Sequence, residues 1–290
     1  MNLPAYVAGM AIACLVQVAV AMPAPLSISV ITEESETPIY TTKAARIAND
    51  AIAAILPYRV CQQDKVKYQL GQNKEHELLV HSQERLTGLT ILKVPRSILK
   101  GDVSPMATTQ PLKIGDKVSF QTDDKKLTHG VYVGREHFHS EVSFPLRMLR
   151  VQFPQLAKPS LGQPCYDKQM RLIGLIVGIS QKGVCHLLPA KAVSFLYTNP
   201  KAKRVRLGCL LDINSATPVI EGMINDGPLA RIGVLTGDIL ISINDTPIRN
   251  YGDMLDASYY LDGSKEVSVK VIRGTQMLKF DDIAPSLDER

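Results

Sequence analysis

Short apolar runs broken by turn-forming residues are the feature that most constrains the fold of this chain. Examples are residues 65–70, 89–94, 130–134, 149–153 and 172–179, which are separated by segments rich in Gly, Pro and Asp. Several short strands with turn signals between them are typical of an all-β barrel or sandwich. We therefore expect a mainly β domain over residues 41–200, with a short helix at residues 190–196 near its end.

The start of this domain predicts a helix instead. Apolar residues recur at helical spacing between residues 44 and 55. Thr41 or Thr42 could cap such a helix, and Pro57 would end it. The preceding residues, 22–40, are polar and contain prolines, so we interpret them as a linker.

The N-terminus has the pattern of a signal peptide. Residues 7–21 carry no charge, and a stretch of about 15 residues falls short of the roughly 20 that a spanning helix needs. Ala19-Val20-Ala21 offers a small-x-small cleavage pattern, with a weaker one at Met22-Pro23-Ala24. We expect residues 1–21 to direct the chain to the periplasm or the exterior. Because no Lys or Arg precedes Val7, an uncleaved segment that associates the chain with a membrane is the alternative.

Composition and cysteine spacing exclude other classes of protein. An apolar fraction of 45% with 21% charged residues is typical of a globular chain. The net charge of +5 gathers only at residues 201–206, which we interpret as a solvated linker and not as a nucleic-acid surface. Four cysteines would remain after export (Cys61, Cys165, Cys185, Cys209). They could form two disulfides in any of three pairings, or they could stay as buried free thiols. Their wide spacing fits no metal site, and no cofactor is expected.

Beyond residue 206 the pattern changes to mixed strands and helices. Residues 218–224, 238–244, 267–272 and 276–280 are expected strands, and helices are expected after Gly227 and over residues 250–260. Residues 227–248 (GPLARIGVLTGDILISINDTPI) resemble the PDZ pattern "SPAAxAGLxxGDxIxxxNGxxI". The resemblance implies a PDZ domain over residues 206–285, a β-sandwich with two helices.

The PDZ resemblance implies a peptide-binding groove. In such domains an extended peptide adds a strand to an open sheet edge, and backbone amides hold its terminal carboxylate. Residues 206–210 resemble the carboxylate loop, so the implied ligand contacts are Leu207, Gly208, Cys209 and Leu210 from the loop, and Tyr251, Leu255 and Ser258 from the helix. Met254 and Ala257 are then expected to face the core, and each apolar contact could instead serve packing alone.

Weaker motifs in residues 41–200 resemble the trypsin-like domain of HtrA/Deg proteases. Residues 64–71 and 89–94 are similar to "DEITVTLSDG…TDLAVLKV", and residues 114–118 to "VGDWV". Residues 159–164 (PSLGQP) stand where this family has "GNSGGP", and residues 183–189 fit "GIGFAIP". The order of these pieces, ahead of a PDZ domain, implies a degenerate trypsin-like domain.

The positions implied to be catalytic lack the required chemistry. A serine protease needs a nucleophile, a base, a carboxylate and oxyanion donors. The nucleophile position falls on Leu161, the carboxylate position on Gly88, and one oxyanion donor on Pro159, which has no N–H. The hairpin that carries "TNNHVV" and its His is expected to be absent, which would leave the first barrel incomplete.

Other residues could restore chemistry only by a different arrangement. Ser160 lies one position from the nucleophile, and Ser143 and Ser180 are nearby in sequence. His137 and His139 share one face of an expected strand, as the start of a metal site would. No third ligand is evident, so we interpret them as exposed strand residues and His186 as a packed one.

Three functions remain open. The first is an exported, non-catalytic scaffold whose PDZ domain binds C-terminal or extended peptide segments. The second is a divergent, active HtrA-like serine endopeptidase in envelope protein quality control. The third is an envelope assembly component, alone or as a homo-oligomer, whose PDZ domain docks other proteins.

Overall fold

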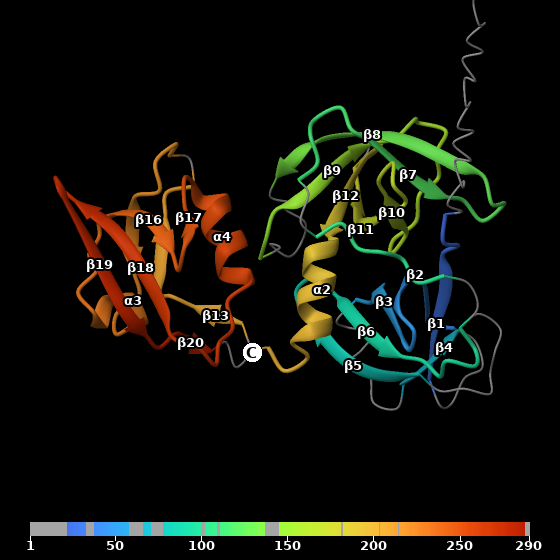
Figure 1. Cartoon of the computed structure of the whole chain (residues 1–290), viewed down its shortest axis with the longest axis horizontal. Helices are drawn as coiled ribbons and strands as arrows, with labels where there is room; N and C mark the ends of the chain where they lie inside the picture. Colours follow the sequence, from blue (N-terminus) through green and yellow to red (C-terminus); the bar gives the residue numbers. More distant parts are fainter. Residues whose placement is uncertain are drawn as a thin grey trace, which may run out of the picture.

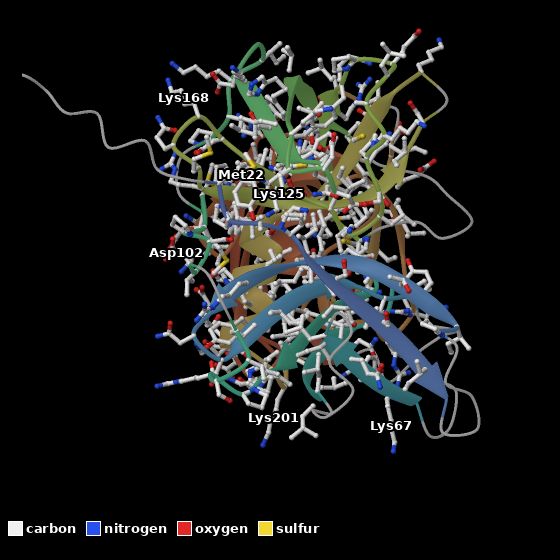
Figure 2. All side chains as sticks on the ribbon, turned by 90° about the vertical axis from the view of Figure 1, so that its right-hand side faces the viewer. Met22, Lys67, Asp102, Lys125, Lys168 and Lys201 are labelled. Atoms are coloured by element: carbon white, nitrogen blue, oxygen red, sulfur yellow. The ribbon has the colours of Figure 1, made fainter. Side chains whose placement is uncertain are left out.

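The computed structural model describes residues 22–32, 38–57, 66–70, 78–99, 102–108, 111–136, 145–180, 182–202, 204–213 and 215–287. The expected signal peptide, Cys61, Ser143, His137 and His139 lie outside these residues. The chain forms two β units followed by a C-terminal domain (Figure 1). Charged side chains such as Lys67, Lys168 and Lys201 extend from the surface of the molecule at separate places (Figure 2).

The first unit is a six-stranded sheet with the order β4-β1-β2-β3-β6-β5. All of its pairings are antiparallel. The strands are β1 (Leu26–Thr32), β2 (Tyr40–Ala48), β3 (Ala51–Ile55), β4 (Val66–Leu70), β5 (Leu79–Glu84) and β6 (Leu89–Lys93).

The linker predicted over residues 22–40 is wrong, because most of it belongs to this sheet. β1 lies between β2 and β4, and Ile28 and Val30 are fully buried. The alternation of Ile28 and Val30 with Ser27 and Ser29 is the strand period of two. Neighbouring Pro and Thr residues are typical of a linker, so the strand was not predicted from the sequence.

The helix predicted over residues 44–55 is also wrong, because these residues form the β2–β3 hairpin. Ala48 faces Ala51 across a two-residue turn of Asn49 and Asp50. All five residues of β3 are buried, and a short, continuous apolar run fits a buried strand and a helix equally well. The described end of this hairpin, at Leu56 and Pro57, contains no His, and the absence of the family's His-bearing hairpin stays a prediction.

The second unit is a closed barrel with the order β10-β11-β12-β9-β8-β7, as the strand pattern predicts. A short helix, α2 (Ala190–Thr198), follows it. The barrel strands are β7 (Lys117–Gln121), β8 (Leu127–Glu136), β9 (Met148–Gln152), β10 (Pro164–Tyr166), β11 (Leu172–Ile179) and β12 (Val184–Pro189).

A shared core joins the two β units. It contains Ala45 and Ile91 from the sheet, Tyr166 and Leu175 from the barrel, and Leu196 from α2. Burying such side chains stabilises the fold by about 1.5–3 kcal/mol for each large aliphatic residue. The sheet and the barrel are therefore packed directly against each other.

The C-terminal domain is built as the sequence predicts, with β16, β18 and β19 in one antiparallel sheet and two helices. Its core includes the side chains of Leu229, Leu240 and Met254. The elements are β13 (Val205–Arg206), β14 (Cys209–Leu211), β15 (Ile220–Met223), α3 (Pro228–Arg231), β16 (Ile239–Ile243), β17 (Thr246–Pro247), α4 (Tyr251–Tyr259), β18 (Val267–Arg273), β19 (Gln276–Ile283) and β20 (Ser286–Leu287).

Candidate functional site

The loop before β10 places Leu161 between the two β units. The Leu161 carbonyl accepts hydrogen bonds from Thr42 Oγ1 at 3.1 Å and from the Lys43 N–H at 3.4 Å. Gly162 has a φ of +74°, and a Cβ there would lie 2.3 Å from the Lys43 carbonyl oxygen. The loop is therefore pressed against β2, and its Leu161 side chain, 41% exposed, has no hydroxyl group.

Gly88 stands in the turn that leads into β6. Its carbonyl accepts a 2.8 Å bond from the Leu56 N–H. With a φ of +70°, a Cβ at this position would lie 2.5 Å from the Leu56 carbonyl oxygen. Real Cβ atoms do not approach a backbone oxygen so closely. The chain therefore has no aspartate at this position, and the backbone conformation would not accept one.

The other hydroxyl and imidazole groups predicted as alternatives are engaged elsewhere. Ser160 Oγ donates to Gln163 Oε1 at 3.2 Å, and Ser180 Oγ accepts from the Val184 N–H. His186 is buried on β12, with Nδ1 3.8 Å from Glu136 Oε1. Burial lowers the pKa of His186, which favours its neutral form.

One hydroxyl–imidazole pair was missed by the sequence reasoning. Ser119 Oγ and His129 Nδ1 lie 2.7 Å apart, because these two residues face each other across the β7–β8 hairpin. Ser119 is buried, and burial lowers the pKa of His129. Their positions on adjacent strands of one hairpin could have predicted this contact. Neither residue lines the two interdomain cavities described below.

The loop that resembles a carboxylate-binding loop lies between β13 and β14. Its Gly208 has a φ of +81°, and a Cβ there would lie 3.1 Å from Gly227 Cα. The Gly208 carbonyl accepts from the Ile224 N–H at 2.8 Å, and the Leu207 carbonyl accepts from the Leu229 N–H at 3.1 Å. These contacts fix the loop against the start of α3.

The side chains of this loop divide between core and surface. Leu207 is 5% exposed and packs in the domain core, and its contact with a ligand stays a prediction. Leu210 is 63% exposed, and burial raises the pKa of the Cys209 thiol to about 11. Within the described residues β14 pairs only with β15, which leaves one edge of β14 unpaired.

Helix α4 carries the other predicted contacts. Asn250 caps it, because Asn250 Oδ1 accepts from the Asp253 N–H at 3.0 Å. Met254 and Ala257 are buried in the core, as expected. Leu255 and Ser258 instead line a cavity of about 180 Å³.

That cavity lies between the C-terminal domain and the barrel. Leu255, Ser258 and Arg206 form one wall, while Phe195 and Pro145 of the barrel unit form another. Figure 1 shows α4 on the side of the C-terminal domain that faces α2. No sequence pattern predicts this arrangement, because it joins residues from two domains.

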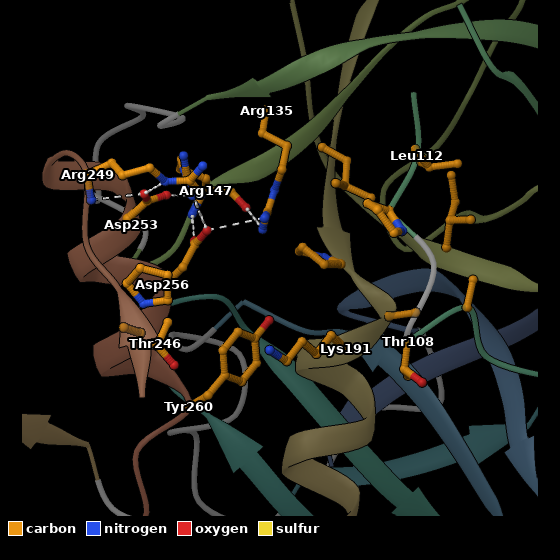
Figure 3. Close-up of a pocket in the computed structure, with 18 of the residues that line it drawn as sticks. Thr108, Leu112, Arg135, Arg147, Lys191, Thr246, Arg249, Asp253, Asp256 and Tyr260 are labelled. Atoms are coloured by element: carbon orange, nitrogen blue, oxygen red, sulfur yellow. Dashed lines mark hydrogen bonds and ion pairs between the residues drawn. The ribbon is translucent and has the colours of Figure 1, made fainter. Parts of the chain in front are cut away.

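Ion pairs fasten α4 to the barrel. Arg147 donates to Asp256 through Nε at 3.0 Å and Nη2 at 2.7 Å, and to Asp253 Oδ1 through Nη2 at 2.7 Å. Arg135 Nη1 lies 3.2 Å from Asp256 Oδ2 (Figure 3). Burial raises the pKa of Asp253, but hydrogen bonds from Arg147 and Arg249 outweigh it, and the pKa falls below its usual value.

Three further observations describe the molecule. Cys165, Cys185 and Cys209 are free thiols. In the described residues, no group of three or more His, Cys, Asp or Glu side chains is arranged to hold a metal ion. Among the helices of the described residues, none has the length and hydropathy to span a membrane.

Comparison with known proteins identifies the C-terminal domain and the overall fold. Residues 219–273 match the PDZ domain family. No curated protein sequence matches the chain. Residues 219–273 therefore belong to a PDZ domain, a protein module that binds peptides.

Solved structures of HtrA-type proteases share the whole architecture. The HtrA-type protease AlgW with a tripeptide is 17% identical, with a TM-score of 0.68 over 93% of this chain and 95% of that chain. AlgW with a decapeptide is 16% identical, with a TM-score of 0.63 over 92% and 96%. The serine endoprotease from Yersinia pestis is 18% identical, with a TM-score of 0.59 over 92% and 96%. The chain therefore has the fold of an HtrA-type protease with a C-terminal PDZ domain.

Proposed function

We propose that this protein is a non-catalytic, exported scaffold whose PDZ domain binds the C-terminal or extended segments of other proteins. The observation that carries the proposal is the edge of β14 that pairs with no strand of the described residues, in the domain that also contains helix α4. A peptide strand can add to such an edge through main-chain hydrogen bonds. Gly208 would let the peptide carboxylate approach the loop, and Leu210 would lie along the bound strand.

The small interdomain cavity supports a preference for an apolar last residue. Leu255 and Ser258 of α4 lie at this cavity, and Phe195 of α2 lies opposite them. About 180 Å³ of space accommodates one side chain. We infer that the last side chain of the ligand enters here, so that the barrel unit contributes to recognition. Cys209 and Tyr251 would border the remainder of the groove.

Three positions support the proposed absence of catalysis. Leu161 offers no nucleophile, Pro159 offers no N–H, and a side chain at Gly88 would collide with Leu56. Loss of a single oxyanion donor costs about 3 kcal/mol of transition-state stabilisation. The second candidate, a divergent endopeptidase, is favoured only by the fold that the chain shares with HtrA-type proteases.

The site of action would be the cell envelope. This follows from the expected signal peptide at residues 1–21, and it implies that the mature protein begins at residue 22 or 25. An uncleaved N-terminus would instead keep the protein at a membrane. Docking of envelope proteins, with or without self-association, is the role that the PDZ groove would then serve.

Isothermal titration with one peptide in two forms tests this function. The peptide ends in an apolar residue and is used as the free acid and as the C-terminal amide. Amidation removes the charge that the loop N–H groups face, and a charge-assisted bond is worth roughly 1.5–3 kcal/mol. The amide should therefore bind at least about tenfold more weakly.

Two matched variants locate the binding. Leu255→Lys places a charge in the groove and should abolish binding of the free acid. Leu235→Lys changes a residue that is 53% exposed and should leave binding unchanged. Equal affinities of the acid and the amide, or binding that survives Leu255→Lys, would refute the proposed groove.

A further inference from the structure

A second, larger cavity lies between the domains, on another side of α4. It has a volume of about 620 Å³, within the range of ligand-binding clefts. Its walls come from the barrel, from the start of α2 and from the C-terminal domain (Figure 3). Leu112, Leu149 and Ile173 give it an apolar surface. We refer to it as the interdomain cleft.

The interdomain cleft has an excess of positive charge. Four cationic side chains line it, Arg135, Arg147, Lys191 and Arg249, against two carboxylates, Asp253 and Asp256. Both carboxylates already accept bonds from arginines. No ion pair of Lys191 is found among the described residues, where its ammonium group lies 4.2 Å from the centre of the Tyr260 ring.

Two further features of the cleft favour an anion. Tyr260 Oη is buried, with no hydrogen-bond partner in the described part of the chain. Helix α2 begins at the cleft with Ala190 and Lys191, has no side-chain cap and carries no acidic residue in its first turn. The N-terminus of a helix carries partial positive charge and unpaired N–H groups. A carboxylate near Lys191 would therefore meet three sources of favourable interaction.

We propose that the interdomain cleft binds an acidic peptide segment, with one carboxylate side chain at Lys191 and apolar neighbours against Leu149 and Ile173. Charge complementarity selects the carboxylate, because the cleft's own acids are already paired. The apolar wall selects a peptide with hydrophobic residues over a simple anion. This site is separate from the PDZ groove, because it needs neither a free C-terminus nor Leu255.

The test uses a peptide that cannot occupy the carboxylate loop. N-acetylated and C-terminally amidated Leu-Glu-Leu-Glu is titrated into the purified protein, beside the same peptide with Gln in place of Glu. The acidic peptide should bind, and the Gln peptide should bind at least about tenfold more weakly. Binding should weaken as salt is raised, because the charges are partly exposed.

Variants assign the site. Lys191→Gln should weaken the acidic peptide about tenfold, and Lys191→Arg should retain most of the binding. Lys168→Gln, an exposed lysine away from the cleft, is the matched control. Leu255→Lys should not change this affinity, which separates the result from that of the PDZ groove. No binding by the acidic peptide, equal binding of the Gln peptide, or an unchanged affinity in Lys191→Gln would overturn the proposal.

Discussion

Single residues decide how far this chain can share the chemistry of its structural neighbours. At Leu161, Thr42 and Lys43 hold the carbonyl in place by hydrogen bonds, but the side chain is hydrocarbon. At Gly88 the backbone itself excludes a carboxylate. Restoring one residue would therefore not restore a triad, since the change at Gly88 also requires movement of Leu56.

Asp238 is a residue whose ionisation should control the stability of the PDZ domain. It is 1% exposed and accepts two 2.8 Å bonds from Arg273 and one 2.9 Å bond from the Leu235 N–H. Arg273 holds the pKa of Asp238 below its usual value. Its contribution to stability is thus present above about pH 4 and is lost as the pH falls through the native pKa.

Asp238→Asn should consequently lower the free energy of unfolding by about 1–3 kcal/mol at pH 7. The difference from the unmodified protein should shrink as the pH falls from 5 to 3. Urea unfolding at several pH values measures both, with Asp245→Asn, an exposed residue, as the control. A difference that stays constant with pH would show that the charge of Asp238 is not responsible.

At the scale of elements, the sequence predicts strands well where turn signals bound them. β11 and α4 lie at or within one residue of their expected positions, and the PDZ pattern anticipates the buried Met254 and Ala257. The β2–β3 hairpin was misread because a fully buried strand shows no alternation. The shared cavity at Leu255 and Phe195 was beyond prediction, since its walls come from separate domains.

Alanine substitutions at two glycines test whether the loop between β13 and β14 holds the ligand carboxylate. Gly208 and Gly237 have φ values of +81° and +91°, so alanine at either costs roughly 1–2 kcal/mol. Only at Gly208 would the added Cβ meet a neighbour, Gly227 Cα at 3.1 Å, whereas nothing lies within 4 Å at Gly237. Gly208→Ala should weaken peptide binding in calorimetry at least about tenfold.

Gly237→Ala should lose similar stability but keep its peptide affinity, because it lies outside the loop. This comparison separates the shape of the loop from the general cost of a left-handed residue. If both variants bind the peptide equally well, the loop does not hold the ligand carboxylate.

For the whole molecule, Arg147 is expected to keep the two domains together. Arg147→Ala removes its side-chain bonds to Asp253 and Asp256, which should weaken domain docking by about 1–3 kcal/mol. Small-angle scattering should then report a larger radius of gyration. Lys126→Ala, which breaks only an exposed pair with Asp124, should leave the radius unchanged, and an unchanged radius in Arg147→Ala would contradict this role.

Docking should also depend on pH through Asp253. Because the native pKa of Asp253 is lowered, its ion pair with Arg147 is retained above about pH 4 and weakens as the pH falls further. The radius of gyration of the unmodified protein should thus increase below pH 4 and approach that of Arg147→Ala. Growth of the radius at neutral pH instead would point to another contact.

The proposed non-catalytic role depends most of all on a barrel without an activated serine nucleophile. The direct measurement is the intact mass of the purified protein after incubation with a fluorophosphonate, which labels activated serines. We predict no mass increase, and no hydrolysis of unfolded casein by the same sample. A single adduct, abolished together with caseinolysis by Ser160→Ala, would contradict the account and identify the protein as a divergent serine endopeptidase.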